Sequence, residues 1–132
     1  MLNAKNLMIG DWVEIDGKIG TVSFLDKEGY INVAINETQM IVTRNPNPIQ
    51  LTPEILEKNK MREFEHRNPG QGDNLIKKWW HKDGSYYVSL YSVGDECTYT
   101  VGDSITRICR IRYVHELQHA LRLCGIEKEI II

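Results

Sequence analysis

The sequence predicts an α+β protein in which a four-stranded antiparallel meander precedes a β-hairpin, a C-terminal helix and a final short strand. In four short N-terminal runs, apolar and polar residues alternate, which is the period of half-buried strands. Near the C-terminus, apolar residues recur every three or four positions, as in an amphipathic helix. With 132 residues, of which 42% are hydrophobic and 26% charged, the chain can form one globular domain or two very small ones.

The first predicted unit covers residues 1–64. Its strands are expected at 12–15, 19–25, 30–35 and 39–43, separated by turn residues at 16–17, 26–29 and 36–38. A short helix is expected at 53–60. Thr52 can cap this helix, Pro53 suits its first position and Glu54 suits its first turn.

Residues 10–22 read GDWVEIDGKIGTV, with a valine strand, a glycine turn and a second glycine before the next strand. This arrangement resembles the opening of SH3-like and KOW-type barrels, and the resemblance covers the N-terminal third of the chain. It implies a small barrel that binds RNA, proteins or peptides, or that serves only as a scaffold. Because a fold does not determine a function, we expect the scaffold role.

The polar, glycine-rich residues 65–74 are predicted to form a loop before a second unit at 75–132. In this unit, 75–81 and 86–91 are expected to pair as a hairpin around residues 82–85. Further strands are expected at 98–101 and 105–113, followed by a helix at 114–124 and a strand within 126–132. Gly125 is expected to end the helix. The two units could also form one compact domain.

The predicted helix contains an H-E-x-x-H motif at residues 115–119. Two histidines four residues apart on a helix can bind one Zn²⁺, and the glutamate between them can act as general base. Four apolar residues, spaced three and four apart, predict the buried stripe of the helix: Val114, Leu117, Leu121 and Cys124. His115, His119 and Arg122 are therefore predicted to lie on the opposite, solvated face.

A catalytic zinc needs three protein ligands, and the sequence offers no third one at a familiar spacing. In the extended pattern H-E-x-x-H-x-x-G-x-x-H, Arg122 replaces the glycine and Gly125 replaces the last histidine. Arg122 would also bring a positive charge near the metal. Upstream candidates without ligand-pair spacing are His66, His81, Cys97 and Cys109.

We therefore favour solvated histidines on a packed helix, with no cofactor and no enzymatic activity. A zinc hydrolase, with His115 and His119 as ligands and Glu116 as base, is the first alternative.

Composition excludes several other classes. The net charge of −2 argues against a general nucleic-acid binder. The three cysteines are odd in number and unpatterned, so reduced thiols are expected. Neither a membrane-length apolar run nor a signal-peptide pattern is found, so we expect a cytoplasmic protein, of a bacterium or an infected host, without membrane contact.

The predicted hairpin combines basic and aromatic residues: Lys77, Lys78, Trp79, Trp80 and Tyr86. Strand alternation sends one tryptophan inward and the other outward. Arg110 and Arg112 share a strand face and could extend the surface. Such residues can hold single-stranded nucleic acid, which is the second alternative. We favour an unidentified protein partner. The pattern does not define an oligomeric state.

Three segments in order, LMIGDWV at 7–13, PIQLTPEILEK at 48–58 and YVHELQ at 113–118, resemble a group of uncharacterised small proteins. This group belongs to gut anaerobic bacteria and their phages or mobile elements, and the resemblance covers most of the chain. Its members often read H-x-L-Q-N at the helix, so His119 departs from their pattern. The resemblance implies a binding or accessory protein of a phage or mobile element.

Overall fold

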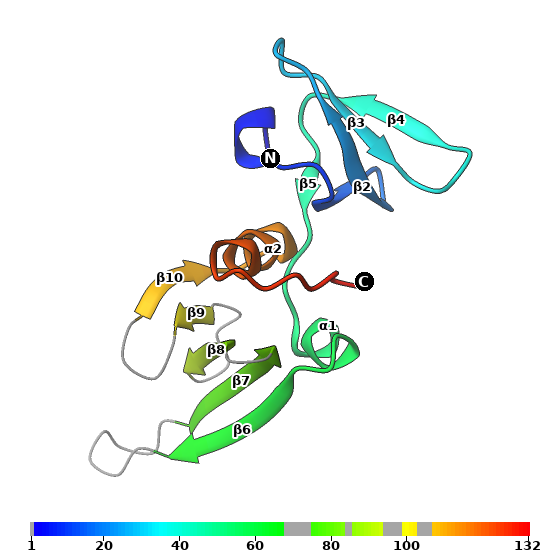
Figure 1. Ribbon diagram of the computed structural model, residues 1–132. Helices are drawn as coiled ribbons and strands as arrows, with labels where there is room; N and C mark the ends of the chain where they lie inside the picture. The colour runs from blue at the N-terminus through cyan, green and yellow to red at the C-terminus, as the bar shows by residue number, and fades with distance from the viewer. Residues whose placement is uncertain (1, 68–74, 84–85, 94–98, 103–106) are drawn as a thin grey trace. The chain divides into compact units, whose positions relative to one another are not determined.

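In the computed structural model, the described residues are 2–67, 75–83, 86–93, 99–102 and 107–132, and side chains are described at 2–61 and 110–132. The chain forms two compact units (Figure 1). The first contains Met1–Gln50 with Tyr113–His115, and the second contains Leu51–Arg112 with Glu116–Ile132. The short helix that the sequence grouping assigned to the first unit thus belongs to the second.

A five-stranded antiparallel sheet, in the order β4-β3-β2-β1-β5, forms the first unit (Figure 1). The elements are the 3-10 turn η1 (Ala4–Asn6), β1 (Trp12–Ile15), β2 (Lys18–Leu25), β3 (Ile31–Ala34), β4 (Met40–Thr43) and β5 (Asn47–Pro48). The four strands predicted from alternation are confirmed. Strand β5, which pairs with β1, was not predicted.

Alternation along these strands builds the core of the first unit. The buried residues of this core are Leu2, Leu7, Val13, Ile15, Val22, Ile31 and Val33. Asp16 and Gly17 form the β1–β2 turn with φ angles of 50° and 78°, the positive values that a two-residue hairpin turn favours. Gly20 allows close strand packing, because a Cβ atom there would lie 2.6 Å from the Ala34 carbonyl oxygen.

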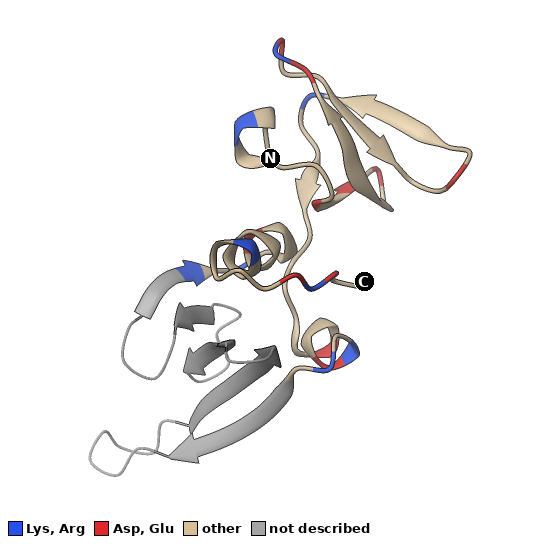
Figure 2. Cartoon of the chain, in the orientation of Figure 1, with Lys and Arg blue, Asp and Glu red and all other residues tan. Residues whose placement is uncertain are grey.

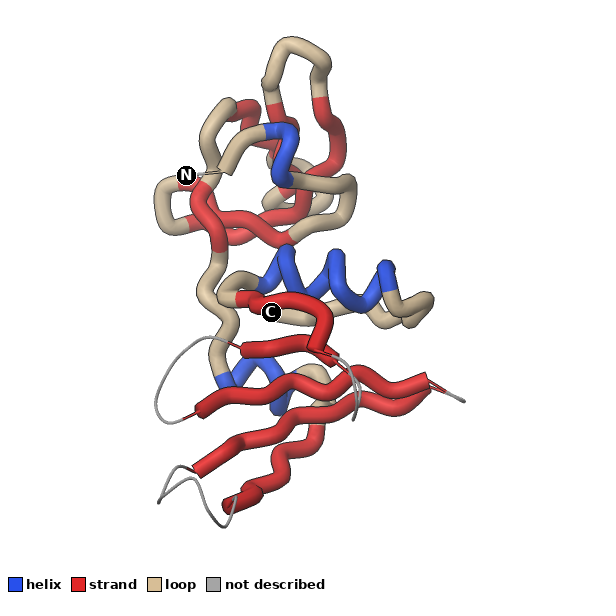
Figure 3. Tube along the Cα trace, turned by 90° about the vertical axis from the view of Figure 1, so that its left-hand side faces the viewer, coloured by secondary structure: helices blue, strands red, loops and turns tan. Residues whose placement is uncertain are grey.

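The second unit contains helix α1, a five-stranded antiparallel sheet and most of helix α2 (Figures 1 and 3). Its strand order is β10-β9-β8-β7-β6. The elements are α1 (Pro53–Lys58), β6 (Arg62–Arg67), β7 (Leu75–Asp83), β8 (Tyr86–Val93), β9 (Tyr99–Gly102), β10 (Arg107–Ile111) and α2 (Val114–Leu123). The mixed α+β class is therefore confirmed.

Helix α1 begins as predicted. The Thr52 hydroxyl accepts a hydrogen bond from the Ile55 N–H at 3.4 Å, and Pro53 is the first helical residue. The β7–β8 hairpin is also present, although residues 84–85 of its turn lie outside the described residues. The predicted loop at 65–74 is wrong for residues 65–67, which belong to β6, and its remainder, 68–74, lies outside the described residues.

The prediction of a final strand within 126–132 is wrong, because no strand is assigned to this segment. Ile126 and Ile130 are buried, which explains the strand-like spacing of apolar residues. The backbone of Ile131 pairs with a side chain instead of a strand. Its N–H donates to Asn59 Oδ1 at 2.7 Å, and its carbonyl accepts from Asn59 Nδ2 at 2.7 Å. Thus an asparagine side chain replaces the neighbouring strand.

Helix α2 ends at a left-handed glycine, as predicted. Gly125 has φ +71°, and its N–H donates to the Arg122 carbonyl at 3.0 Å. The Ile126 N–H donates to the Leu121 carbonyl at 2.9 Å, and both side chains are buried. These two bonds define a Schellman motif. None of the helices in the described part of the chain is long and apolar enough to cross a membrane.

Candidate functional site

The glutamate of the H-E-x-x-H motif takes part in the start of helix α2. Glu116 Oε2 accepts a hydrogen bond from the Arg112 N–H at 3.2 Å. A carboxylate in the first helical turn also interacts favourably with the helix dipole. The side chain that would act as general base in a zinc hydrolase therefore stabilises the helix N-terminus.

His115 is buried, so the prediction that it lies on a solvated face is wrong. Only 4% of the residue is exposed, and its ring stacks on Tyr113 with centroids 5.9 Å apart and planes 10° apart. Three of the four predicted stripe residues, Val114, Leu117 and Leu121, are buried, and the fourth, Cys124, is half-buried. Gln118 is buried as well, so the buried surface of α2 is wider than a single stripe.

The second histidine differs from the first, because His119 is only half-buried and Arg122, one turn further on, is exposed. Where the structure describes side chains, no group of three or more His, Cys, Asp or Glu residues could hold a metal ion. Side chains of the upstream candidates His66, His81 and Cys109 are not among those described, and Cys97 lies outside the described residues. Cys124 is a free, half-buried thiol.

The β7–β8 hairpin carries most residues of the predicted binding surface. Trp79 lies opposite Leu90 and Trp80 opposite Ser89, near the middle of an eight-pair register. On the other side of β7, strand β6 places Glu63 opposite Trp79. The structure describes the backbone of these residues and of Lys77, Lys78 and Tyr86, but not their side chains.

The two arginines proposed to extend this surface are both exposed. Arg110 belongs to β10 and lies opposite Thr100 of β9, while Arg112 follows the end of β10. Figure 2 shows basic residues at this end of β10. The sheet order separates β10 from β7 by β8 and β9, so the arginines are not adjacent in the sheet to Trp79 and Trp80.

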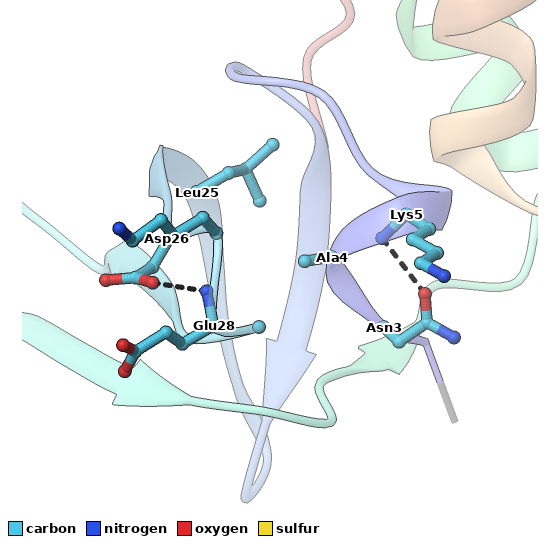
Figure 4. Close-up of a pocket in the computed structure, with 8 residues that line it drawn as sticks. Asn3, Ala4, Lys5, Leu25, Asp26 and Glu28 are labelled. Atoms are coloured by element: carbon cyan, nitrogen blue, oxygen red, sulfur yellow. Dashed lines mark hydrogen bonds between the residues drawn. The ribbon is translucent and has the colours of Figure 1, made fainter.

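A pocket of about 500 Å³ lies in the first unit, between η1 and the β2–β3 turn (Figure 4). Its lining includes two lysines and two acidic residues, so their charges balance. The polar groups serve the turns themselves: Asn3 Oδ1 accepts from the Lys5 N–H, and Asp26 Oδ1 accepts from the Glu28 N–H.

Sequence reasoning missed an exposed apolar surface on the first sheet. The Phe24 residue is 54% exposed, Met40 54% and Val42 58%. An available signal was the uninterrupted run Met40-Ile41-Val42, which a strand with one solvated polar face would not contain.

Comparison with known proteins finds no match for this chain among protein-family models, curated proteins or solved structures.

Proposed function

We propose that the protein is a non-enzymatic binding or accessory module that contacts a protein partner through the β7–β8 hairpin. An association with a phage or mobile element is part of this proposal and rests on the three resembling sequence segments. The first unit serves as the scaffold in this proposal and is an SH3-like barrel. Its support is the strand order, in which β5 returns to pair with β1.

A structural role for the H-E-x-x-H motif supports the absence of catalysis. His115 is buried and stacked on Tyr113, and the Glu116 carboxylate accepts a backbone hydrogen bond. A general base must reach a metal-bound water in an open site. Both residues have contacts that explain their presence without such a site.

The observation that carries the choice of a protein partner is the register between β6 and β7. Glu65 lies directly opposite Lys77, and Glu63 lies opposite Trp79. A nucleic-acid surface needs uncompensated positive charge, whereas in these two pairs an acidic residue lies opposite a basic and an aromatic one. The pairs between them, Arg62–Trp80 and Phe64–Lys78, carry no acidic residue. Tryptophan and other aromatic residues are enriched at the cores of protein interfaces, which favours a protein partner.

The binding proposal predicts that the hairpin tryptophans are needed for partner capture but not for folding. Affinity capture from host lysate, followed by measurements with the purified captured protein, should show at least tenfold weaker binding for Trp79→Ser or Trp80→Ser. Replacement of the tryptophan that makes the contact should leave the melting temperature unchanged. Phe24→Ser removes an exposed aromatic residue of the first unit and is the matched control.

Unchanged affinity in both tryptophan variants would contradict the proposal. So would tight binding of a single-stranded oligonucleotide with an affinity that falls steeply with salt, because that behaviour identifies a nucleic-acid module.

The non-enzymatic proposal predicts that protein purified without a histidine tag is folded and contains far less than one zinc per chain. Elemental analysis measures the metal, and circular dichroism checks the fold. Near-stoichiometric zinc that disappears in His119→Ala would favour the hydrolase instead. Glu28→Ala, at an exposed acidic residue of the first unit that is no candidate ligand, is the control for adventitious metal.

A further inference from the structure

We propose that β4, the open edge of the first sheet, pairs antiparallel with β4 of a second copy of this chain. This interface uses the first unit and does not involve the hairpin of the proposed function. The inference rests on three properties of the edge: its residue types, the direction of its backbone groups and its distribution of charge.

The residues of β4 do not protect the edge. Edge strands usually carry lysine, proline or a bulge that prevents pairing with another chain. Strand β4 reads Met-Ile-Val-Thr, and these residues are apolar or favour strands. The edge strand at the other side of the sheet, β5, contains Pro48. In Figure 2, β4 carries no charged residue along its length. Thus β4 is the edge suited to pairing.

The hydrogen-bond pattern of the β3–β4 ladder indicates which backbone groups point outward. The Ile35 N–H donates to the Gln39 carbonyl at 2.9 Å, and the register continues without a shift to the Ile31–Thr43 pair. Hydrogen-bonded and non-hydrogen-bonded pairs alternate along an antiparallel ladder. Met40 and Val42 therefore direct their backbone N–H and carbonyl groups toward the open edge.

Pairing about a two-fold axis at Ile41 places Met40 opposite Val42 of the second copy. Each such pair can exchange both of its backbone hydrogen bonds. The same register brings together the side chains of Met40 and Val42, which are 54% and 58% exposed in the single chain. Phe24, 54% exposed, lies in the same cross-strand row as Asn32 and Val42 and extends this apolar surface inward.

The charges at the ends of β4 are complementary under antiparallel pairing. Glu37 lies in the loop before the strand. In this loop, Asn36 Oδ1 accepts hydrogen bonds from the Thr38 and Gln39 N–H groups. Arg44 follows the strand and lies over the Tyr30 ring at 4.2 Å. Both charged residues are exposed. In the Ile41 register, Arg44 faces Thr38 of the second copy, next to its Glu37. Parallel pairing would instead place like charges together.

A four-residue edge buries less surface than a standard protein interface, so we expect a weak dimer that forms at concentrations on the order of 100 µM. Sedimentation equilibrium of the full chain should show the mass rising toward twice the monomer value over this range. Val42→Lys should shift the self-association constant by at least tenfold, because a charged side chain at the edge opposes pairing. The exposure of Val42 protects the fold from this change, and the melting temperature checks it.

Two further variants test the geometry. Glu37→Arg alone should weaken the dimer, and Glu37→Arg with Arg44→Glu should restore it, since the reversed charges are again complementary. Phe24→Lys, on the same face but away from the edge, should weaken the dimer less than Val42→Lys. Hydrogen exchange of the Met40 and Val42 amides should slow as the protein concentration rises.

Several outcomes would overturn the inference. A wild-type chain that stays monomeric to millimolar concentration excludes self-pairing, as does a dimer that persists in Val42→Lys. Stronger disruption by Phe24→Lys would assign the contact to face packing. Failure of the double charge reversal to restore association would exclude the antiparallel Ile41 register. Amide protection that appears only with an added extended peptide would identify a different strand as the occupant.

Discussion

Asn59 is the residue whose role is least evident from the sequence and best defined by the structure. It follows helix α1 and is 3% exposed. Its Nδ2 donates to the Ile55 and Ile131 carbonyls at 2.8 and 2.7 Å, and its Oδ1 accepts from the Ile131 N–H at 2.7 Å. A single amide thus joins the end of a helix to a segment more than seventy residues later.

Replacing Asn59 should destabilise the second unit. Asn59→Ala removes all three hydrogen bonds from a buried site, with an expected loss of about 2–4 kcal/mol in the free energy of unfolding. Asn59→Asp keeps an acceptor for the Ile131 N–H but places a carboxylate beside two carbonyl oxygens, so it should also destabilise. Urea denaturation followed by circular dichroism measures both changes.

Lys58→Ala is the matched control for Asn59. Lys58 is exposed and its Nζ donates to the Ile132 carbonyl at 2.7 Å, so its removal should cost less than about 0.5 kcal/mol. Faster hydrogen exchange at the Ile131 amide in Asn59→Ala would locate the effect in the tail. An Asn59→Ala protein as stable as the wild type would contradict the assigned role.

At the scale of elements, the sequence predicted strands where one face of the sheet is buried. Alternation identified β1 to β4, because residues at every second position of a strand face the core. Val13 and Ile15 do so in β1, and Val22 of β2 belongs to the same core. It missed β6, which reads Arg-Glu-Phe-Glu-His-Arg, because pairing with β7 rather than an apolar pattern defines this strand. Pairing with a neighbouring strand is not encoded in the periodicity of one segment.

The tail and helix α2 also show the limit of periodicity, because here an apolar pattern is present and part of its prediction is wrong. The buried isoleucines at 126 and 130 suggested a strand, but the partner of the tail backbone is a side chain, which no periodicity reveals. In α2 the spacing predicted three buried stripe residues correctly and still failed for His115, because the buried arc of the helix is wider than the apolar stripe and also includes His115 and Gln118. The candidate hairpin was predicted as a backbone element, and its binding role stays a prediction.

Helix α2 supplies a prediction that separates a structural from a catalytic role for Glu116. Glu116→Ala removes the hydrogen bond to the Arg112 N–H and a favourable charge at the helix N-terminus, so unfolding should become easier by about 0.5–1.5 kcal/mol. Glu116→Gln keeps an oxygen acceptor and should cost less. Thermal and urea unfolding measure both variants.

Glu127→Ala is the control for Glu116, since this exposed residue lies beyond the helix and should leave stability within about 0.5 kcal/mol of the wild type. An unchanged unfolding curve for Glu116→Ala would exclude the stabilising role. The presence of Glu116 at this position would then need another explanation.

At the scale of the whole molecule, neither unit is continuous in sequence. The first unit takes Tyr113 and the first two residues of α2, Val114 and His115, and the second takes the segments on either side of these residues. Within the first unit, the Val114 N–H donates to the Ile49 carbonyl at 2.9 Å, and Gln50 forms an isolated antiparallel bridge with Tyr113. A single cut in the sequence therefore cannot separate the two units.

This arrangement predicts that residues 1–50 alone are mostly unfolded. The fragment lacks the Ile49–Val114 hydrogen bond and the buried Val114 side chain, and a chain of this length forms only a marginal core. Joining residues 113–115 to it through a short Gly-Ser linker should raise the folded fraction, because the Leu51 N–H and the Arg112 carbonyl, at the two cut points, lie 2.8 Å apart. Nuclear magnetic resonance dispersion of the amide signals distinguishes the two chains. A cooperative, fully folded 1–50 fragment would show instead that the first five strands suffice, and that the residues from α2 only cover a unit that is already complete.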